Sequence, residues 1–169
     1  VKPFFMDLKE VSNSQYADFL EANPETQKPK GWKTRSAPNK GLEAFPVVGV
    51  SFAEAGAYAR WAGGKRLPNA AEWAMAASGP EKRRFPWGYY SELDIHRCNS
   101  RLASKEKLVP VEDYVDGELQ GLSPFGIANL SGNAAEWATH TNSVETKKAF
   151  ICGGSFRSHI FACQANSRV

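Results

Sequence analysis

The stretch GGSFRSHIFACQANSR occupies residues 153–168 and holds one of the chain's three cysteines. Two earlier blocks precede it, RLPNAAEW at residues 66–73 and GNAAEW at residues 132–137. In the first of these blocks a helix begins, in which Trp73 is expected to pack inward while Glu72 serves the helix cap. Three blocks in this order, spread over most of the chain, form a pattern that is very improbable by chance.

Three stretches begin with the same helix-start signal. A short polar residue, Ser12, Ser51 or Asn69, is followed three residues later by Gln or Glu. The first side chain can accept a hydrogen bond from the free amides of the first turn, and the second can accept one from the cap's own N–H. We therefore predict three helices that begin after these residues, the second and third ending at Gly63-Gly64 and Gly79-Pro80.

The remaining sequence predicts short strands and long loops. Residues 4–7, 47–50 and 149–152 are expected to be extended, and the last of these runs into the Gly-Gly turn. Residues 82–126 show little periodicity and much Pro, Gly and aromatic content. Loops of this length in a compact domain usually carry function or are disordered.

Composition narrows the class of protein. A chain of 169 residues is long enough for one domain with a real core. No apolar run approaches the roughly 20 residues that span a bilayer, and no charged-then-apolar leader opens the sequence. The net charge of +3 is spread along the chain, whereas a nucleic-acid binder usually concentrates it on one stripe. We expect neither membrane insertion nor a nucleic-acid partner; three cysteines leave the redox compartment open.

With its three blocks in this order, the chain resembles the formylglycine-generating enzyme family, also called sulfatase-modifying factors. The stretches FMD at 5–7, EVSN at 10–13 and FPWG at 85–88 extend the agreement. The resemblance implies a large, irregular C-type-lectin-like α+β fold with few short strands, about three main helices and long loops. Family members usually carry an earlier first strand and a closing Gly-Phe-Arg strand. We therefore expect residues 1–169 to be a single domain that lacks both.

The C-terminal block departs from the family at one position. The enzymes place a first catalytic cysteine three residues beyond the Ser of Gly-Gly-Ser and a second one five residues further. Counted from Ser155, these positions hold Ser158 and Cys163, and His159 supports the register because a His often follows the first cysteine. In the family, the two thiolates bind copper(I), a soft ion suited to sulfur, and oxygen then oxidises a cysteine of a client sulfatase to formylglycine. A hydroxyl is a weak ligand for copper(I), so we expect no copper and no catalytic residue, with Cys163 and Cys152 as the fallback pair.

The middle block carries residues that lie near bound calcium in the family. Asn133 and Glu136 supply the oxygen ligands that calcium prefers, and Asn99 is a weaker candidate. The resemblance therefore implies a structural calcium ion; the alternative is that Asn133 forms a turn and Glu136 a buried hydrogen bond. Family members usually carry a bulky residue near Ala134 and Ala135, so its loss should empty some volume or shift a loop.

These observations favour a non-catalytic binding, sensing or scaffold module of a larger bacterial protein, for example a Ser/Thr kinase or a diversified ligand-binding surface protein. The alternative is an active copper-dependent oxidoreductase of the family, and a third reading is a purely structural domain. The partner would be a protein, a peptide or a small molecule. The residues expected to make surface contacts are Trp32, Trp87, Tyr89, Tyr90, Phe156, Arg157 and His159.

Overall fold

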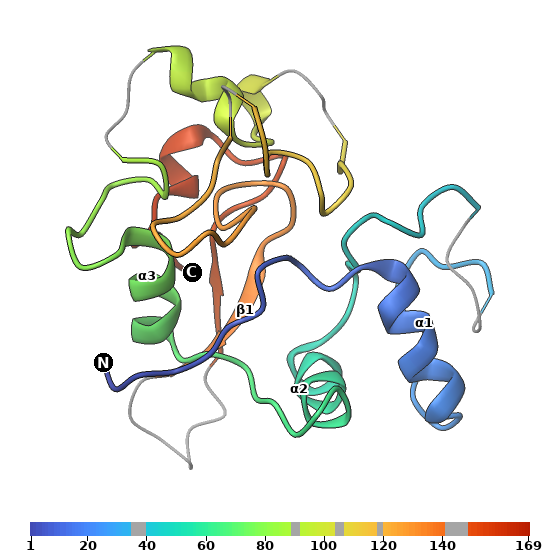
Figure 1. Cartoon of the computed structure of the whole chain (residues 1–169). Helices are drawn as coiled ribbons and strands as arrows, with labels where there is room; N and C mark the ends of the chain where they lie inside the picture. Colours follow the sequence, from blue (N-terminus) through green and yellow to red (C-terminus); the bar gives the residue numbers. More distant parts are fainter. Residues whose placement is uncertain (35–39, 89–91, 104–106, 118–119, 141–148) are drawn as a thin grey trace.

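The computed structural model describes residues 1–34, 40–88, 92–103, 107–117, 120–140 and 149–169. It contains three α-helices, and Figure 1 shows how they lie around a short sheet. The helices are α1 Asn13–Ala22, α2 Phe52–Trp61 and α3 Ala70–Ser78. The strands are β1 Glu136–Thr139 and β2 Ala149–Cys152, and the 3-10 helices are η1 Glu92–Arg97, η2 Arg101–Ala103 and η3 Ile160–Cys163.

The three predicted helices are confirmed, and each begins with the predicted reciprocal cap. In α1, the Ser12 hydroxyl accepts from the backbone N–H of Gln15, whose side chain in turn accepts from the Ser12 N–H. The same exchange of hydrogen bonds opens α2 at Ser51 and α3 at Asn69. Each cap contributes about 1 kcal/mol to helix stability. Helix starts are thus set by local hydrogen bonding, which a sequence records directly.

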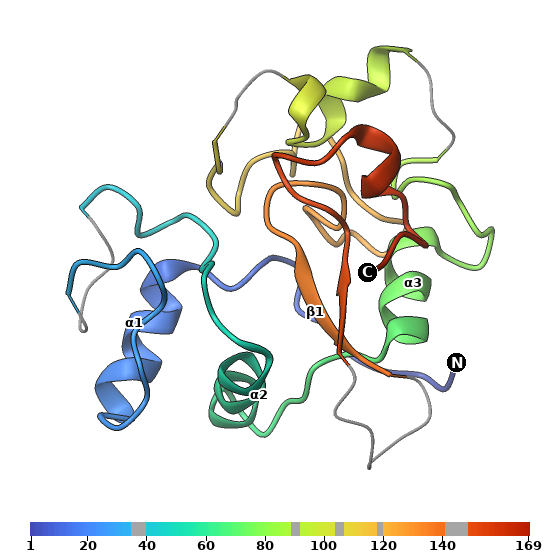
Figure 2. The ribbon, with the colours of Figure 1, turned by 180° about the vertical axis from the view of Figure 1, so that it is seen from behind.

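Helices α1 and α2 pack together through aromatic rings on one side of the molecule (Figures 1 and 2). Tyr16 of α1 stacks on Tyr58 of α2 with ring centroids 5.6 Å apart, and Phe19 meets the same ring edge-on. Trp32 closes this cluster at 7% exposure. The prediction of Trp32 as a surface contact is therefore wrong, because its ring is needed to fill the space beside Tyr16.

The sheet lies between α2 and α3, and in the described part of the chain it consists of β1 and β2, paired antiparallel with Trp137 opposite Ile151. The prediction of an extended segment at 149–152 is confirmed as β2, whereas β1 was not predicted. Residues 4–7 and 47–50 form no strand. Residues of the second segment make single bonds to loops instead of a ladder, as when Val47 N donates to Val11 O at 2.8 Å.

The main core lies between α3 and the sheet. Trp73 is 1% exposed and packs with Leu130 and neighbouring apolar residues. Its indole N–H donates to Glu136 Oε2 at 2.7 Å, which links α3 to β1. Glu72 caps α3 and also pairs with Arg66 at 2.7 Å. The expected roles of Trp73 and Glu72 are both confirmed.

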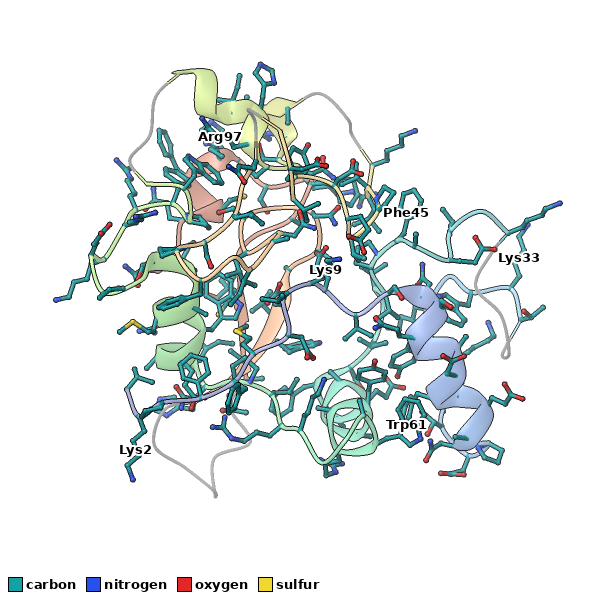
Figure 3. All side chains as sticks on the ribbon, in the orientation of Figure 1. Lys2, Lys9, Lys33, Phe45, Trp61 and Arg97 are labelled. Carbon is teal, nitrogen blue, oxygen red and sulfur yellow. The ribbon has the colours of Figure 1, made fainter. Side chains whose placement is uncertain are left out.

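Charged side chains are distributed around the surface. Figure 3 places the labelled Lys2, Lys33 and Arg97 towards separate edges of the molecule and Lys9 near the middle of the view. Within the described ranges, no helix has the length and apolar character needed to cross a bilayer.

Candidate functional site

The turn after β2 brings the two positions of the family's cysteine pair next to the same glycine, Gly154. Gly153 and Gly154 have positive φ angles of 80° and 66°. Beyond them, Ser158 N donates to Ser155 O at 2.8 Å, and Ser155 N donates to Ser158 Oγ at 3.0 Å. This closed turn directs Ser158 back onto Gly154, where a built Cβ would lie 3.2 Å from Ser158 Cβ.

Cys163 approaches the same glycine from η3. A Cβ on Gly154 would lie 2.8 Å from Cys163 Sγ, closer than real Cβ atoms approach a neighbour. Ser158 and Cys163 are therefore neighbours in space as well as in the register counted from Ser155. We call Gly154, Ser158 and Cys163 the sulfur pocket. Its two facing positions hold one thiol and one hydroxyl.

The thiol of this pocket is buried and protonated. Cys163 is 0% exposed, and its Sγ donates to His159 O at 3.7 Å. Burial raises the pKa of Cys163 to about 11, against a weaker lowering by the backbone amides of Gly132 and Ser155. Metals and oxidants react with the thiolate. At neutral pH Cys163 is a protonated thiol, which is the unreactive form.

The other two cysteines are also buried thiols. Cys152 lies on β2 in the main core, and burial raises its pKa to about 11. Cys98 lies in a separate cluster with Phe85 and Ile160, and burial raises its pKa to about 12. All three cysteines are free. The fallback pair Cys152 and Cys163 is thus not joined by a disulfide.

A second polar group lies beneath the loop before β1, and we call it the polar cluster. Its centre, Asn133, is 0% exposed and has a positive φ of 54°. Asn133 Oδ1 accepts from Asn99 Nδ2 at 3.1 Å, and Asn133 Nδ2 donates to Glu10 Oε2 at 2.8 Å. Glu10 Oε1 accepts from Ala134 N at 3.0 Å. The members of the cluster are Glu10, Asn99, Asn129, Asn133 and Glu136.

Two carboxyl groups of this cluster are held in a poorly solvated place. Burial, followed by the nearby charge of Glu136, raises the pKa of Glu10 well above its ordinary value despite hydrogen bonds from Asn133 and Ala134. Burial likewise raises the pKa of Glu136 to about 7, opposed by the hydrogen bond from Trp73. A cation placed here would relieve both effects, because it favours the charged carboxylate.

The cluster has the donor chemistry of a calcium site. Within the described part of the chain, no three His, Cys, Asp or Glu side chains converge on one point. Two buried amide oxygens, Asn99 Oδ1 and Asn129 Oδ1, have no hydrogen-bond partner, and Asn129 contacts Glu10. Amide and carboxylate oxygens are ordinary calcium ligands. Of the three predicted ligands, Asn99 and Glu136 have oxygens to offer, whereas Asn133 uses its amide for the turn and its cross-links.

Sequence reasoning missed Glu10 and Asn129 as members of this cluster. Glu10 lies 123 residues before Asn133 in the chain, so no local spacing relates them. The usable signal was a single polar residue in apolar surroundings: Asn129 stands between Ala128 and Leu130, and it is buried at 4% exposure.

The predicted surface contacts divide into two groups. Trp87 stacks on Phe85 with centroids 5.2 Å apart and packs against a core cluster, so it is mainly structural. Tyr89 and Tyr90 lie outside the described residues. The other predicted contacts lie around η3, beside the sulfur pocket, and they are Phe156, Arg157 and His159.

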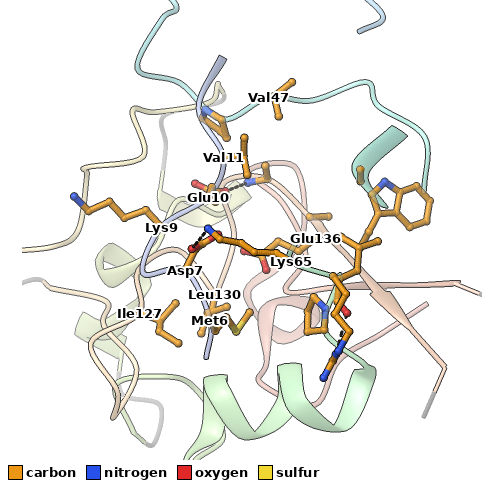
Figure 4. Close-up of a pocket in the computed structure, with 18 of the residues that line it drawn as sticks. Met6, Asp7, Lys9, Glu10, Val11, Val47, Lys65, Ile127, Leu130 and Glu136 are labelled. Carbon is orange, nitrogen blue, oxygen red and sulfur yellow. Dashed lines mark hydrogen bonds and ion pairs between the residues drawn. The ribbon is translucent and has the colours of Figure 1, made fainter. Parts of the chain in front are cut away.

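A cleft of about 880 Å³ runs beneath the N-terminal segment (Figure 4). Glu10 and Glu136 both line it, together with apolar residues such as Met6 and Leu130. Its rim carries an ion pair between Lys65 and Asp7 at 2.7 Å. Ala134 and Ala135, near which members of the family usually carry a bulkier residue, also line this cleft.

The whole described sequence matches one known protein family. The profile of the sulfatase-modifying factor enzyme 1-like domain, the FGE-sulfatase domain, matches residues 1–169. The chain belongs to this family. The resemblance expected from the three sequence blocks is therefore confirmed at the level of the family.

Relatives of this FGE-sulfatase domain differ in what their names say they do. The formylglycine-generating enzyme of Thermomonospora curvata is 39% identical, over 63% of this chain and 38% of its own length. The serine/threonine-protein kinase pkn1 of Chlamydia caviae is 32% identical, over 79% of this chain and 22% of its own length. The mouse inactive C-alpha-formylglycine-generating enzyme 2 is 29% identical, over 83% of this chain and 59% of its own length. The chain spans less than two thirds of each of these relatives.

Solved structures confirm the α+β fold with long loops. PvdO from Pseudomonas aeruginosa superposes with a TM-score of 0.71 at 17% identity, over 95% of this chain and 71% of that one. Treponema denticola variable protein 1 superposes with a TM-score of 0.68 at 18% identity, over 95% of this chain and 76% of that one. At such low identity the likeness establishes the fold alone.

Proposed function

We propose that this FGE-sulfatase domain is a non-catalytic binding, sensing or scaffold module of a larger bacterial protein. The observation that carries the proposal is the sulfur pocket, where Ser158 faces Cys163 in place of a second thiol. The hydroxyl of Ser158 is already engaged by Ser155 N, and the thiol of Cys163 is buried and protonated. A copper(I) ion needs soft, deprotonated sulfur ligands, which this pair does not supply.

The relatives support a domain that works within larger polypeptides. A stretch like this chain makes up 22% of the kinase pkn1 of Chlamydia caviae, and a related mouse protein is named as inactive. A domain of this fold also forms a Treponema variable protein. We propose the same use here, as a folded platform whose loops contact a protein, a peptide or a small molecule.

An oxygen-consumption assay tests this function against the active alternative. The chain is supplied with copper(I), a reducing agent and a cysteine-containing sulfatase peptide, and the peptide is then searched by mass spectrometry for formylglycine. We expect no oxygen uptake above the copper blank and no modified peptide. Turnover that disappears in Cys163→Ser would replace the binding module with an oxidoreductase. A purely structural role would leave every binding screen negative while removal of the domain destabilises the parent protein.

We further propose that the polar cluster holds a structural calcium ion. Glu136 and Glu10 would supply carboxylate oxygens, and Asn129 and Asn99 amide oxygens. When bound, calcium supplies positive charge that keeps the buried carboxyl groups ionised. Calcium at tenfold its dissociation constant should stabilise the chain by about 1.4 kcal/mol, seen as a rise in melting temperature that EDTA reverses. Glu136→Gln should remove this rise, and an equal response to calcium in that variant would contradict the site.

A further inference from the structure

The surface over η3 carries arginine and aromatic side chains that neither the sulfur pocket nor the polar cluster uses. We call it the arginine face, and its residues are Arg84, Arg101, Phe156, Arg157, His159 and Phe161. Its three arginines are exposed, as are His159 and Phe161. They come from separate parts of the chain, so the folded structure alone brings them together.

One end of this face is a fixed stack of side chains. The Arg84 guanidinium carbon lies 5.3 Å from the centre of the Phe161 ring, and the His159 ring lies 5.2 Å from the same ring. With the Gln164 amide oriented so that its oxygen faces Arg84, this oxygen accepts from Arg84 Nη2 at 3.0 Å and from Nε at 3.2 Å. Ala165 N also donates to Arg84 O at 3.0 Å. Arg84 is therefore held in place while its remaining N–H groups stay available.

The other end repeats the arrangement. The Arg157 guanidinium carbon lies 5.1 Å from the centre of the Phe156 ring. Arg101 joins the face because its backbone N–H donates to Ser158 O at 3.0 Å. The chain segment from Phe156 to Phe161 thus carries Arg157, and Arg84 and Arg101 contact it from two other parts of the chain.

Unlike Arg66 and Arg83, the arginines of this face have no acidic partner among the described residues. Elsewhere Arg66 pairs with Glu72 and Arg83 with Glu81. Among the residues that the structure describes, none places a carboxylate within ion-pair distance of Arg84, Arg101 or Arg157. Positive charge on this face is therefore uncompensated in the described structure.

We propose that the arginine face docks an acidic peptide segment of a partner protein. This inference rests on the proposed function as a binding module, and it names the chemistry of the partner. A guanidinium offers a planar pair of N–H donors that matches a carboxylate. Stacking on a phenylalanine ring fixes the guanidinium beforehand, so less side-chain entropy is lost when the carboxylate binds.

The same geometry favours a peptide over a nucleic acid. Proteins that bind single strands stack bases on open aromatic faces. Here one face of Phe156 is covered by Arg157, and one face of Phe161 by Arg84. The guanidinium groups that cover these rings are exposed, and their paired N–H donors suit the carboxylates of Asp and Glu side chains.

Fluorescence anisotropy with labelled probes tests this proposal. The probes are a short Asp/Glu-rich peptide, its Asn/Gln counterpart and a single-stranded oligonucleotide of similar length. We expect the acidic peptide alone to bind, with an affinity that falls as salt rises. Each change of Arg84, Arg101 or Arg157 to Gln should weaken binding about tenfold, the value of one charge-assisted hydrogen bond. The matched control is Arg60→Gln on α2, an exposed arginine away from this face.

Each other outcome overturns the proposal in a distinct way. Equal binding of the Asn/Gln peptide, or equal loss in Arg60→Gln, would remove the arginine face as the site while leaving a binding module intact. Tighter binding of the oligonucleotide, lost in the same three variants, would replace the peptide with nucleic acid. Binding by none of the probes overturns the acidic-peptide assignment alone, because the oxygen-consumption assay judges the proposed function separately. Circular dichroism of the variants confirms that each has folded.

Discussion

Two regions of the domain meet on the segment that leads into β1, and they have opposite chemical character. Ser131 Oγ donates to Cys163 O in the sulfur pocket, while Asn133 anchors the polar cluster. The sulfur pocket is closed, since its hydroxyl bonds to its own turn and its thiol is buried. The polar cluster keeps oxygens without partners, those of Asn99 and Asn129.

The difference shows that the fold and its reaction chemistry are separable. The turn that positions Ser158 near Cys163 is built from backbone bonds, glycine conformations and the hydrogen bond from Ser155 N to Ser158 Oγ, and none of these requires a second thiol. The polar cluster instead cross-links Glu10 to the loop before β1, so the fold itself depends on it. We therefore expect that the sulfur pocket can lose its chemistry without loss of structure, whereas loss of the polar cluster destabilises the fold.

The largest expected effect concerns the closed character of the sulfur pocket. The pKa of Cys163, raised to about 11 by burial, lowers its thiolate fraction at pH 8 about a hundredfold, and lack of access slows reaction further. We expect a disulfide reagent to titrate none of the three thiols in the native chain and all three in guanidinium. Rapid native reaction of one thiol, abolished by Cys163→Ser, would show an open, reactive pocket.

The same shift has a consequence for stability at high pH. The folded pKa of Cys163 lies above its unfolded value, so the neutral thiol contributes fully below the unfolded pKa. That contribution is lost as the pH rises towards the folded value of about 11. Cys163→Ala should therefore flatten the alkaline fall in melting temperature.

The next largest effect concerns the polar cluster as a structural cross-link. Glu10→Ala leaves the buried N–H of Ala134 without an acceptor, and Asn133 loses one of its bonds. We expect a loss of about 3 kcal/mol in the free energy of unfolding, measured by urea denaturation. Glu10→Gln should cost less because it keeps an acceptor oxygen.

The adjacent surface pair supplies the control for Glu10. Lys9 pairs with Glu112 in solvent, so Lys9→Ala should change the unfolding free energy by less than about 1 kcal/mol. Equal effects at positions 9 and 10 would remove the distinction between a structural cluster and an ordinary surface ion pair.

A smaller difference in stability, between Gly→Ala changes at two positions, distinguishes close packing in the sulfur pocket from backbone strain. Gly154 and Gly126 both have positive φ, 66° and 77°, but only Gly154 has close neighbours. Gly126→Ala should cost about 1 kcal/mol from backbone strain alone. Gly154→Ala should cost about 2 kcal/mol more, because its Cβ meets Cys163 Sγ and Ser158 Cβ. Equal losses in thermal denaturation would show that the pocket is loosely packed.

Sequence could predict what is local in this molecule. The three capped helices, the inward Trp73 and the register of Ser158 with Cys163 depend on spacings of a few residues. Strand β1 was not predicted because Asn133 and Glu136 of the block at 132–137 were assigned as calcium ligands, and no alternation of apolar and polar residues marks the four residues that pair with β2.

The contents of the candidate sites were harder to predict because they join distant parts of the chain. Glu10 reaches Asn133 across 123 residues, and Arg84 meets Phe161 across most of the second half. Neither contact has a sequence spacing that identifies it. The family resemblance supplied the position of the missing thiol, and the structure supplied what surrounds it.

A copper(I) titration of the native chain beside its Ser158→Cys variant tests the central claim most directly. A competing chelator sets the free copper(I), and thiolate-to-copper absorption reports binding. We expect the native chain to bind no stoichiometric copper(I), and Ser158→Cys to gain one equivalent because its second sulfur would face Cys163 across Gly154. Tight stoichiometric binding by the native chain, lost on Cys163→Ser, would contradict the account.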